Sequence, residues 1–180
     1  MSRFASALSA VLAIAALAAP VLSAQTSEPA APAAAPAPAA ASCPPSATLD
    51  QLIAALNDAV TGPANKDRTC FRQILLPQVR LIPVSTPTAT PRLLTIDDWI
   101  TAVAKHGDSI VTEKQIKYQS ETYGNVAHLW STYETGIDGK PFTRGINSIQ
   151  AVFDGQNWKI AEILWQVESP ATPIPTQYLP

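Results

Sequence analysis

The sequence predicts an α+β domain, in which one strongly bent antiparallel sheet carries helices against one face. Apolar residues recur at helical spacing in the part of the chain before Gly107. Runs of alternating apolar and polar residues then follow up to Glu168, and turn-forming pairs such as Gly124-Asn125 and Asp154-Gly155 separate them. Helices followed by a strand meander bury their apolar faces by packing on one side of the sheet.

The first helix is predicted to begin after Thr48, because Thr48 and Gln51 form a capping box. Gly62-Pro63 is expected to end it. Its apolar face is formed by residues at helical spacing: Leu49, Leu52, Ile53, Leu56 and Val60.

Two shorter helices are predicted next. One begins at Asn65 and ends before Pro77, with Arg68 and Arg72 on a solvated side. The other is capped by Thr95 and ends at Gly107, with His106 in its last turn, where the helix dipole favours a cation. We therefore expect His106 to be a helix-end residue rather than a catalyst.

The remaining elements are predicted strands. Val79–Val84 and Arg92–Leu94 are expected to form a short hairpin on either side of the turn-rich segment Ser85–Pro91. The antiparallel meander is expected to consist of Val111–Tyr123, Val126–Ile137, Phe142–Phe153 and Asn157–Glu168.

The segments outside the folded domain are recognised by composition. A basic start at Arg3, an apolar run from Phe4 to Leu22 and small residues to Ala24 predict a signal peptide over residues 1–24. The alternative is a membrane anchor, which the interruption at Pro20 disfavours. Residues 25–46 are predicted to be a disordered Ala/Pro-rich linker, 47–168 the folded domain, and 169–180 a proline-rich extended tail. We expect export to the periplasm or the medium, without membrane association after cleavage.

The only cysteines are Cys43 and Cys70. In an exported protein a pair of cysteines predicts a disulfide, which would restrict the unfolded chain by roughly 3 kcal/mol. The alternatives are a lipid-modified Cys43 and two free thiols.

Charge and motifs disfavour several classes of partner. The chain has 12 basic and 14 acidic residues, and the basic ones are scattered singly, so no nucleic-acid partner is expected. Its two histidines lie far apart in sequence and on different predicted elements, so no metal site is expected. Phosphate-binding loops are absent as well, and we predict no cofactor.

Strand alternation predicts which side chains share a face of the sheet. A two-residue turn at Asp154-Gly155 places Asn147 opposite Glu162. One face then holds His128, Trp130, Asn147, Ile149, Trp158, Ile160, Glu162, Leu164 and Gln166. The other face holds Leu129, Tyr133, Ile146, Ile163, Trp165 and Val167. Because helices cover only one apolar face, we expect the other to form a homodimer interface, with cover by the tail as the alternative.

The order of elements and the ending G-x-N-S-x-Q…D-G…W-x-I…W-x-x-E, over Thr48 to Glu168, resemble the nuclear transport factor 2-like superfamily. Within it the chain resembles SnoaL-like and ketosteroid-isomerase-like bacterial domains. The resemblance implies a cone-like sheet with three helices packed on its concave face, a pocket between them, and dimerisation through the outer face. It also implies that the face with Trp158 and Ile160 is the concave one.

This face assignment predicts the ligand pocket. Its expected residues are His128, Trp130, Asn147, Trp158, Glu162 and Gln166. We expect it to bind a small, partly apolar ligand, without established catalysis. Asn147 and Glu162 have a second interpretation, in which they satisfy each other across the strand pair.

Two other functions stay open. One is an acid–base isomerase, dehydratase or cyclase that uses His128 or Glu162, helped by Asn147. The carboxylate base of ketosteroid isomerases is missing from Val79 to Thr95, and the paired histidines of related dehydratases are missing too. The other is a dimeric structural or interaction module whose pocket is filled by tryptophan side chains.

Overall fold

The structure is a computed structural model that describes residues 42–84 and 91–180. The predicted signal peptide and most of the linker, together with nearly all of the Ser85–Pro91 connection, lie outside the described residues. The helices are α1 (Leu49–Val60), α2 (Thr69–Ile74), α3 (Ile96–Ala104) and the 3₁₀ turn η1 (Thr176–Tyr178). The strands are β1 (Gly62–Pro63), β2 (Leu75–Val84), β3 (Ile110–Tyr123), β4 (Val126–Ile137), β5 (Lys140–Phe153) and β6 (Trp158–Val167).

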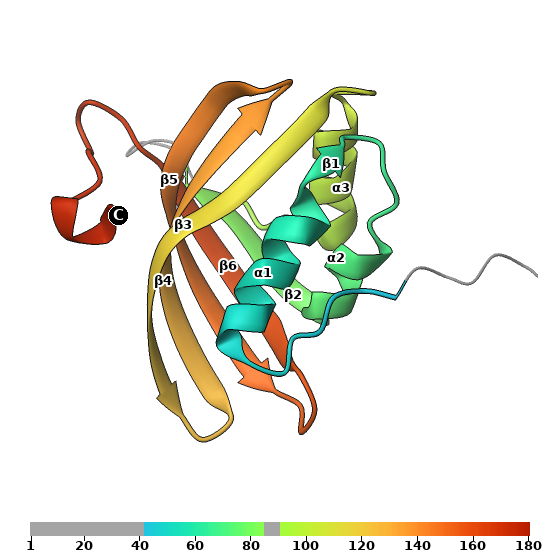
Figure 1. The fold of residues 1–180 in the computed structure, drawn as a ribbon, viewed down its shortest axis with the longest axis vertical. Helices are drawn as coiled ribbons and strands as arrows, with labels where there is room; N and C mark the ends of the chain where they lie inside the picture. Colours follow the sequence, from blue (N-terminus) through green and yellow to red (C-terminus); the bar gives the residue numbers. More distant parts are fainter. Residues whose placement is uncertain (1–41, 85–90) are drawn as a thin grey trace, which may run out of the picture. The chain divides into compact units, whose positions relative to one another are not determined.

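The α+β architecture is confirmed. One curled sheet has the strand order β1-β3-β4-β5-β6-β2, and α1, α2 and α3 lie on its concave side (Figure 1). The sheet is mixed, because β2 pairs parallel to β6. Arg92–Leu94 does not return as a strand, since Leu94 forms only a single bridge with Leu81.

Local sequence signals define the helix ends. Thr48 Oγ1 accepts a hydrogen bond from the Gln51 backbone at 3.2 Å, which completes the predicted capping box of α1. Thr95 caps α3 in the same way, with Asp98 as the reciprocal partner. α2 begins at Thr69, later than predicted.

The prediction that Arg68 lies on a solvated side of its helix is wrong, because its side chain is buried. Only 4% of its surface is exposed. Its Nη1 donates to the backbone oxygens of Ala59 and Val60 at 2.8 and 2.7 Å. Arg68 therefore caps the carbonyl end of α1, a helix that has no basic residue in its own last turn.

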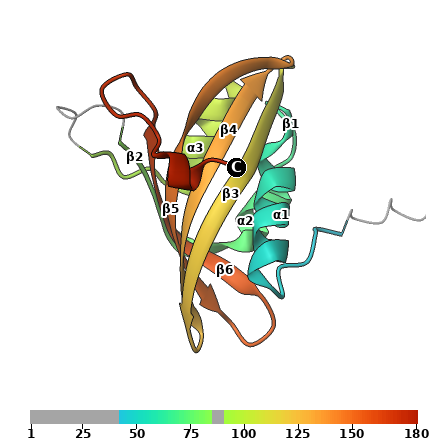
Figure 2. The same ribbon diagram turned by 60° about the vertical axis from the view of Figure 1, so that its left-hand side comes forward.

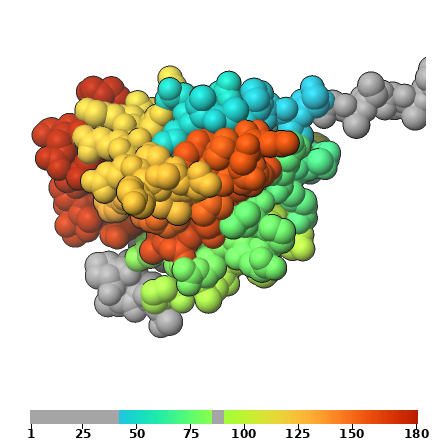
Figure 3. Space-filling view, turned by 90° about the horizontal axis from the view of Figure 1, so that it is seen from below, coloured from blue at the N-terminus to red at the C-terminus, as the bar shows by residue number. Residues whose placement is uncertain are grey.

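The predicted disulfide between Cys43 and Cys70 is confirmed. It attaches the start of the domain to α2, and the backbone of Trp158 donates to Ser46 O at 2.7 Å in the same region. The β3–β4 and β5–β6 turns meet nearby, where Phe153 N donates to Asn125 O at 2.8 Å, at the end of the domain seen in Figure 3. Among the described residues, no helix is long and apolar enough to cross a bilayer.

The C-terminal tail lies against the convex side of the sheet (Figure 2). Ile174 is buried, with 8% of its surface exposed. Thr132 Oγ1 donates to Tyr178 O at 2.6 Å, and Lys117 Nζ donates to Leu179 O at 2.7 Å. The tail thus covers part of the face that the helices do not cover.

One-residue bulges decide which side chains face the helices. In the β4–β5 pair, Gly136 lies opposite Pro141 but Thr135 lies opposite Thr143, so Phe142 is the extra residue. In the β5–β6 pair, Ala151 faces Ile160 but Gln150 faces Glu162, so Ala161 is the extra residue. Each bulge shifts the alternation of its strand by one position.

Candidate functional site

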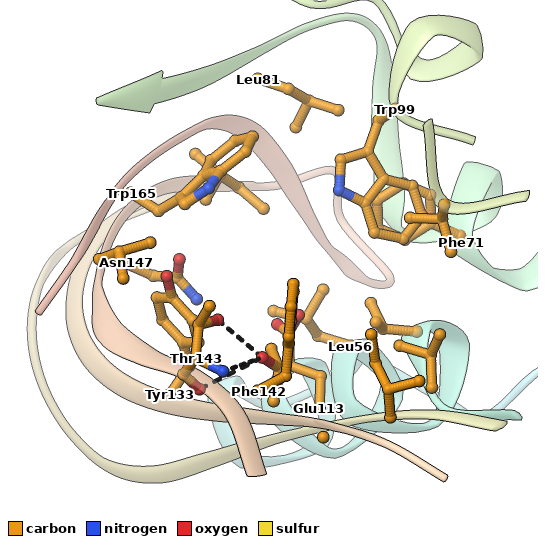
Figure 4. Close-up of a pocket in the computed structure, with 18 of the residues that line it drawn as sticks. Leu56, Phe71, Leu81, Trp99, Glu113, Tyr133, Phe142, Thr143, Asn147 and Trp165 are labelled. Carbon is orange, nitrogen blue, oxygen red and sulfur yellow. Dashed lines mark hydrogen bonds between the residues drawn. The ribbon is translucent and has the colours of Figure 1, made fainter. Parts of the chain in front are cut away.

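A cavity of about 290 Å³ lies between the concave face of the sheet and the helices (Figure 4). Most of its lining is apolar, from both the helices and the sheet: Leu56, Val60, Phe71, Leu81, Trp99, Val103, Val111, Ile137, Phe142, Ile163, Trp165 and Val167. Its polar lining is small and comes mainly from the sheet: Glu113, Tyr133, Thr135, Thr143 and Asn147, with His106 from the turn after α3. A mostly apolar cavity with a few convergent polar groups is typical of a small-molecule site.

Aromatic side chains form opposite walls of the cavity. Phe71 from α2 and Trp99 from α3 stack with ring centres 4.3 Å apart. Trp165 from β6 lies on the other side of the space (Figure 4). Phe142, the bulged residue of β5, is 62% exposed, and the centre of its ring lies 6.3 Å from the centre of the His106 ring.

Glu113 on β3 is the acidic residue of the cavity lining. Gln115 Nε2 donates to its Oε1 at 2.9 Å. Burial raises the pKa of Glu113 to about 7 because removal of water penalises the charged form, and the bond from Gln115 opposes this shift only in part. Glu113 is therefore able to give or accept a proton near neutral pH.

Tyr133 on β4 contributes a hydroxyl beside this carboxyl group. Burial, and then the charge of Glu113, raise the pKa of Tyr133, so its hydroxyl stays protonated over the whole physiological range. The neighbouring Gly145 makes room for the ring, since a Cβ there would lie 2.7 Å from Tyr133 Oη and 2.1 Å from Gln166 O.

A chain of buried amides and hydroxyls leads to Glu113. Gln115 Oε1 accepts from Ser131 Oγ at 2.6 Å and from Asn147 Nδ2 at 3.1 Å. The backbone of Gln115 donates to Asn57 Oδ1 of α1 at 2.9 Å, which fixes β3 against the helix. Ser131, Gln115 and Asn147 are all buried. We call Ser131, Asn147, Gln115 and Glu113 the polar relay.

Of the residues predicted to form the pocket, Asn147 lines the cavity. Trp158 faces the same side of the sheet, where it is buried against Phe153 with ring centres 5.5 Å apart, but it does not line the cavity. His106, expected to be only a helix-end residue, follows α3 and lines the cavity.

The prediction that His128, Trp130, Glu162 and Gln166 face the pocket is wrong. The bulge at Phe142 places Trp130 opposite Ser148, so Trp130 lies on the convex face. The bulge at Ala161 turns Glu162 to the convex face as well. On the convex face His128 Nε2 lies 3.2 Å from Ser148 Oγ, and Glu162 forms an ion pair with Arg80.

The suggested pairing of Asn147 with Glu162 is also wrong. Asn147 lies opposite Trp165 and bonds to Gln115, whereas Glu162 lies opposite Gln150. Trp130 and Gln166 instead line a second hollow, between the convex face and the C-terminal tail.

Sequence reasoning missed Glu113, Gln115 and Tyr133 as site residues. A signal was present, since Glu113 and Gln115 alternate with Val111 and so share a face with an apolar residue. Among the described residues, no three His, Cys, Asp or Glu side chains gather as a metal site would require.

Comparison with known proteins shows the fold. No family model matches the chain, and no curated protein matches it. The β subunit of a putative aromatic-ring-hydroxylating dioxygenase from Novosphingobium aromaticivorans aligns with a TM-score of 0.51 at 12% identity, over 70% of this chain and 94% of that one. A protein of unknown function with a cystatin-like fold from Nostoc punctiforme aligns with a TM-score of 0.51 at 9% identity, over 69% and 91%. An NTF-2-like protein of unknown function from Silicibacter pomeroyi aligns with a TM-score of 0.48 at 14% identity, over 67% and 92%.

Proposed function

Because this chain has a nuclear transport factor 2-like fold with an open cavity, we propose that it binds a small, partly apolar ligand there. The observation that carries the proposal is the composition of the cavity wall. Aromatic and aliphatic side chains surround about 290 Å³, and the few polar groups converge from β3, β4 and β5. Such a wall desolvates an apolar body while a small number of hydrogen bonds fix its orientation.

The test is binding of three bicyclic probes: naphthalene, 2-naphthol and 2-methoxynaphthalene. Affinity is measured by the fluorescence of Trp99 and Trp165, which line the cavity, and by the shift in melting temperature. We expect at least one probe to bind and to raise the melting temperature in proportion to its occupancy. If none of the three binds at its solubility limit, the proposal fails.

A matched pair of variants on α3 locates the site. Val103→Trp places a large ring into the cavity, whereas Ala102→Trp places the same ring on the exposed side of the same helix. We expect Val103→Trp to weaken binding at least about tenfold and Ala102→Trp to leave it unchanged. Equal binding by both variants would place the probe outside this cavity.

A second candidate function is acid–base catalysis on the bound molecule. The observation that favours it is Glu113, whose pKa of about 7 lets it exchange a proton at neutral pH. Glu113 would take the role that the sequence suggested for His128 or Glu162. Solvent deuterium exchange into a bound ketone, followed by NMR, tests this function, and Glu113→Gln is expected to abolish the exchange.

A filled-pocket interaction module is the third candidate, and the open cavity argues against it. A homodimer through the convex face stays a prediction, which the 36% exposure of Trp130 on that face supports. Sedimentation velocity tests it. Export also stays a prediction; the disulfide, which is typical of oxidising compartments, supports it.

A further inference from the structure

The hydrogen bonds of Gln115 define the direction of its side-chain amide. Its Oε1 lies 2.6 Å from Ser131 Oγ and 3.1 Å from Asn147 Nδ2. Its Nε2 lies 2.9 Å from Glu113 Oε1. The reverse orientation would bring the two N–H groups of Gln115 against the N–H group of Asn147, and it would bring a carbonyl oxygen against a carboxyl oxygen. Burial makes such a mismatch costly.

The direction of Gln115 then determines which atoms the relay leaves for a ligand. Asn147 lines the cavity and uses Nδ2 on Gln115, so the atom left to a ligand is the acceptor Oδ1. Glu113 uses Oε1 on Gln115, so its second carboxyl oxygen is left, and that oxygen is an acceptor when the carboxyl group is ionised. Within residues 42–84 and 91–180, no group donates a hydrogen bond to either of these two oxygens.

The hydroxyl of Tyr133 completes the polar end of the cavity. It stays protonated and hydrogen-bonds with Thr143, so it brings a hydroxyl donor into the same cavity lining as Asn147 and Glu113. A ligand hydroxyl meets both needs, because it donates its hydrogen to Asn147 Oδ1 or Glu113 while its oxygen accepts from Tyr133. An ether or ketone oxygen can accept the hydrogen bond from Tyr133 but has no hydrogen to donate. Its lone pairs then face the acceptor oxygens of Asn147 and Glu113, which is unfavourable.

We propose that Gln115 positions Asn147 and Glu113 so that the cavity selects an apolar ligand with a hydroxyl group over one whose polar atom is only an acceptor. This inference rests on the proposed ligand-binding function. Gln115 acts as a positioning residue, since Asn147 and Glu113 stand between it and the ligand.

The experiment compares 2-naphthol with 2-methoxynaphthalene, which differ in the hydrogen-bond donor. Dissociation constants are measured at pH 8, where most Glu113 carboxyl groups are ionised; the other titratable groups that line the cavity are Tyr133 and His106. One additional hydrogen bond corresponds to a preference of about tenfold for 2-naphthol. Equal affinity for the two probes, or tighter binding of the ether, overturns the inference.

Variants test the role of Gln115 itself. Gln115→Leu removes the amide that orients Asn147, so the ratio of the two dissociation constants is expected to fall to about one. The matched control is Gln119→Leu, which changes the same residue type on the same strand at an exposed position and is expected to keep the ratio. A ratio that persists in Gln115→Leu shows that Gln115 does not set the selectivity.

A folding check and the naphthalene probe separate loss of selectivity from loss of structure or of binding. Circular dichroism checks that Gln115→Leu is folded; if it is not, Ser131→Ala removes one of the two donors to Gln115 and is expected to reduce the ratio by a smaller factor. An unchanged ratio in Ser131→Ala counts against the relay. Failure of all three probes, naphthalene included, would overturn the proposed function, whereas binding without discrimination would overturn only this inference.

Discussion

The concave and convex faces of this sheet are built from the same strands, yet their polar residues behave differently. On the concave face, Gln115 and Asn147 bond to each other within the sheet, and Glu113 ends the chain in a cavity. On the convex face, Thr132 and Lys117 bond to the backbone of the C-terminal tail. The comparison indicates that the polar groups of the concave face are arranged around the cavity, whereas those of the convex face bind the C-terminal tail.

The largest expected effect comes from adding a side chain at Gly145, where the backbones of β5 and β6 approach each other closely. Gly145→Ala adds a Cβ 2.1 Å from Gln166 O, so the strands must separate. We expect a loss of about 4 kcal/mol in the free energy of unfolding, measured with urea. Gly124→Ala is the control, because its φ of 55° costs about 1 kcal/mol while its Cβ meets nothing within 4 Å. Equal losses would contradict the close approach.

The next prediction compares isoleucines of β5 that point to opposite faces. Ile149 is fully buried under the helices, whereas Ile146 is half-buried beside the tail. Ile149→Ala is expected to cost about 3 kcal/mol and Ile146→Ala about 1 kcal/mol or less. Urea unfolding of both variants measures the difference. A larger loss at Ile146 would mean that the convex face carries the core.

A third prediction uses pH to separate the faces. The pKa of Glu113 is raised to about 7 in the folded protein, so the folded state holds the proton more tightly than the unfolded chain. The stabilising contribution is complete below the unfolded pKa of about 4.5 and is lost as pH rises to about 7. We expect a loss of about 2 kcal/mol between pH 5 and pH 8.

Two variants assign that loss to the concave face. Glu113→Gln should remove it, and the difference from the parent protein isolates the contribution of Glu113 from other titrating groups. Glu162→Gln, on the convex face, should retain it. Unfolding free energies at the two pH values provide the measurement, and an unchanged pH dependence in Glu113→Gln would be the contrary result.

The smallest expected effect lies on the convex face. Thr132→Val keeps the shape of the side chain but removes the hydrogen bond to Tyr178 O. We expect about 1 kcal/mol less stability and faster hydrogen exchange in residues 169–180, with unchanged probe binding in the cavity. Weaker binding in Thr132→Val would show that the two faces are coupled.

Much of the fold could be predicted from sequence because its signals are local. The capping residues Thr48 and Thr95 mark two helices, and the turn pairs Asp138-Gly139 and Asp154-Gly155 separate long alternating strands. The pair Cys43 and Cys70 pointed to the disulfide that the structure contains.

The site could be predicted only in part because its geometry depends on bulges. A bulge adds one residue without a recognisable break in the alternating pattern, so the sequence does not reveal the bulges at Phe142 and Ala161. Beyond each bulge, every side chain of that strand turns to the other face. Asn147 and Trp158 kept their predicted side of the sheet, whereas Trp130 and Glu162 did not.

The buried Arg68 has a consequence for the dynamics of the cavity wall. Its guanidinium caps the carbonyl end of α1, and it also lies 5.8 Å from the ring centre of Trp99 on α3. Cys70, which lies two residues after Arg68 in the first turn of α2, is covalently bound to Cys43. The end of α1, the start of α2 and the aromatic side of the cavity are thus expected to open as one cooperative unit, and their slowest amides should exchange with a common free energy.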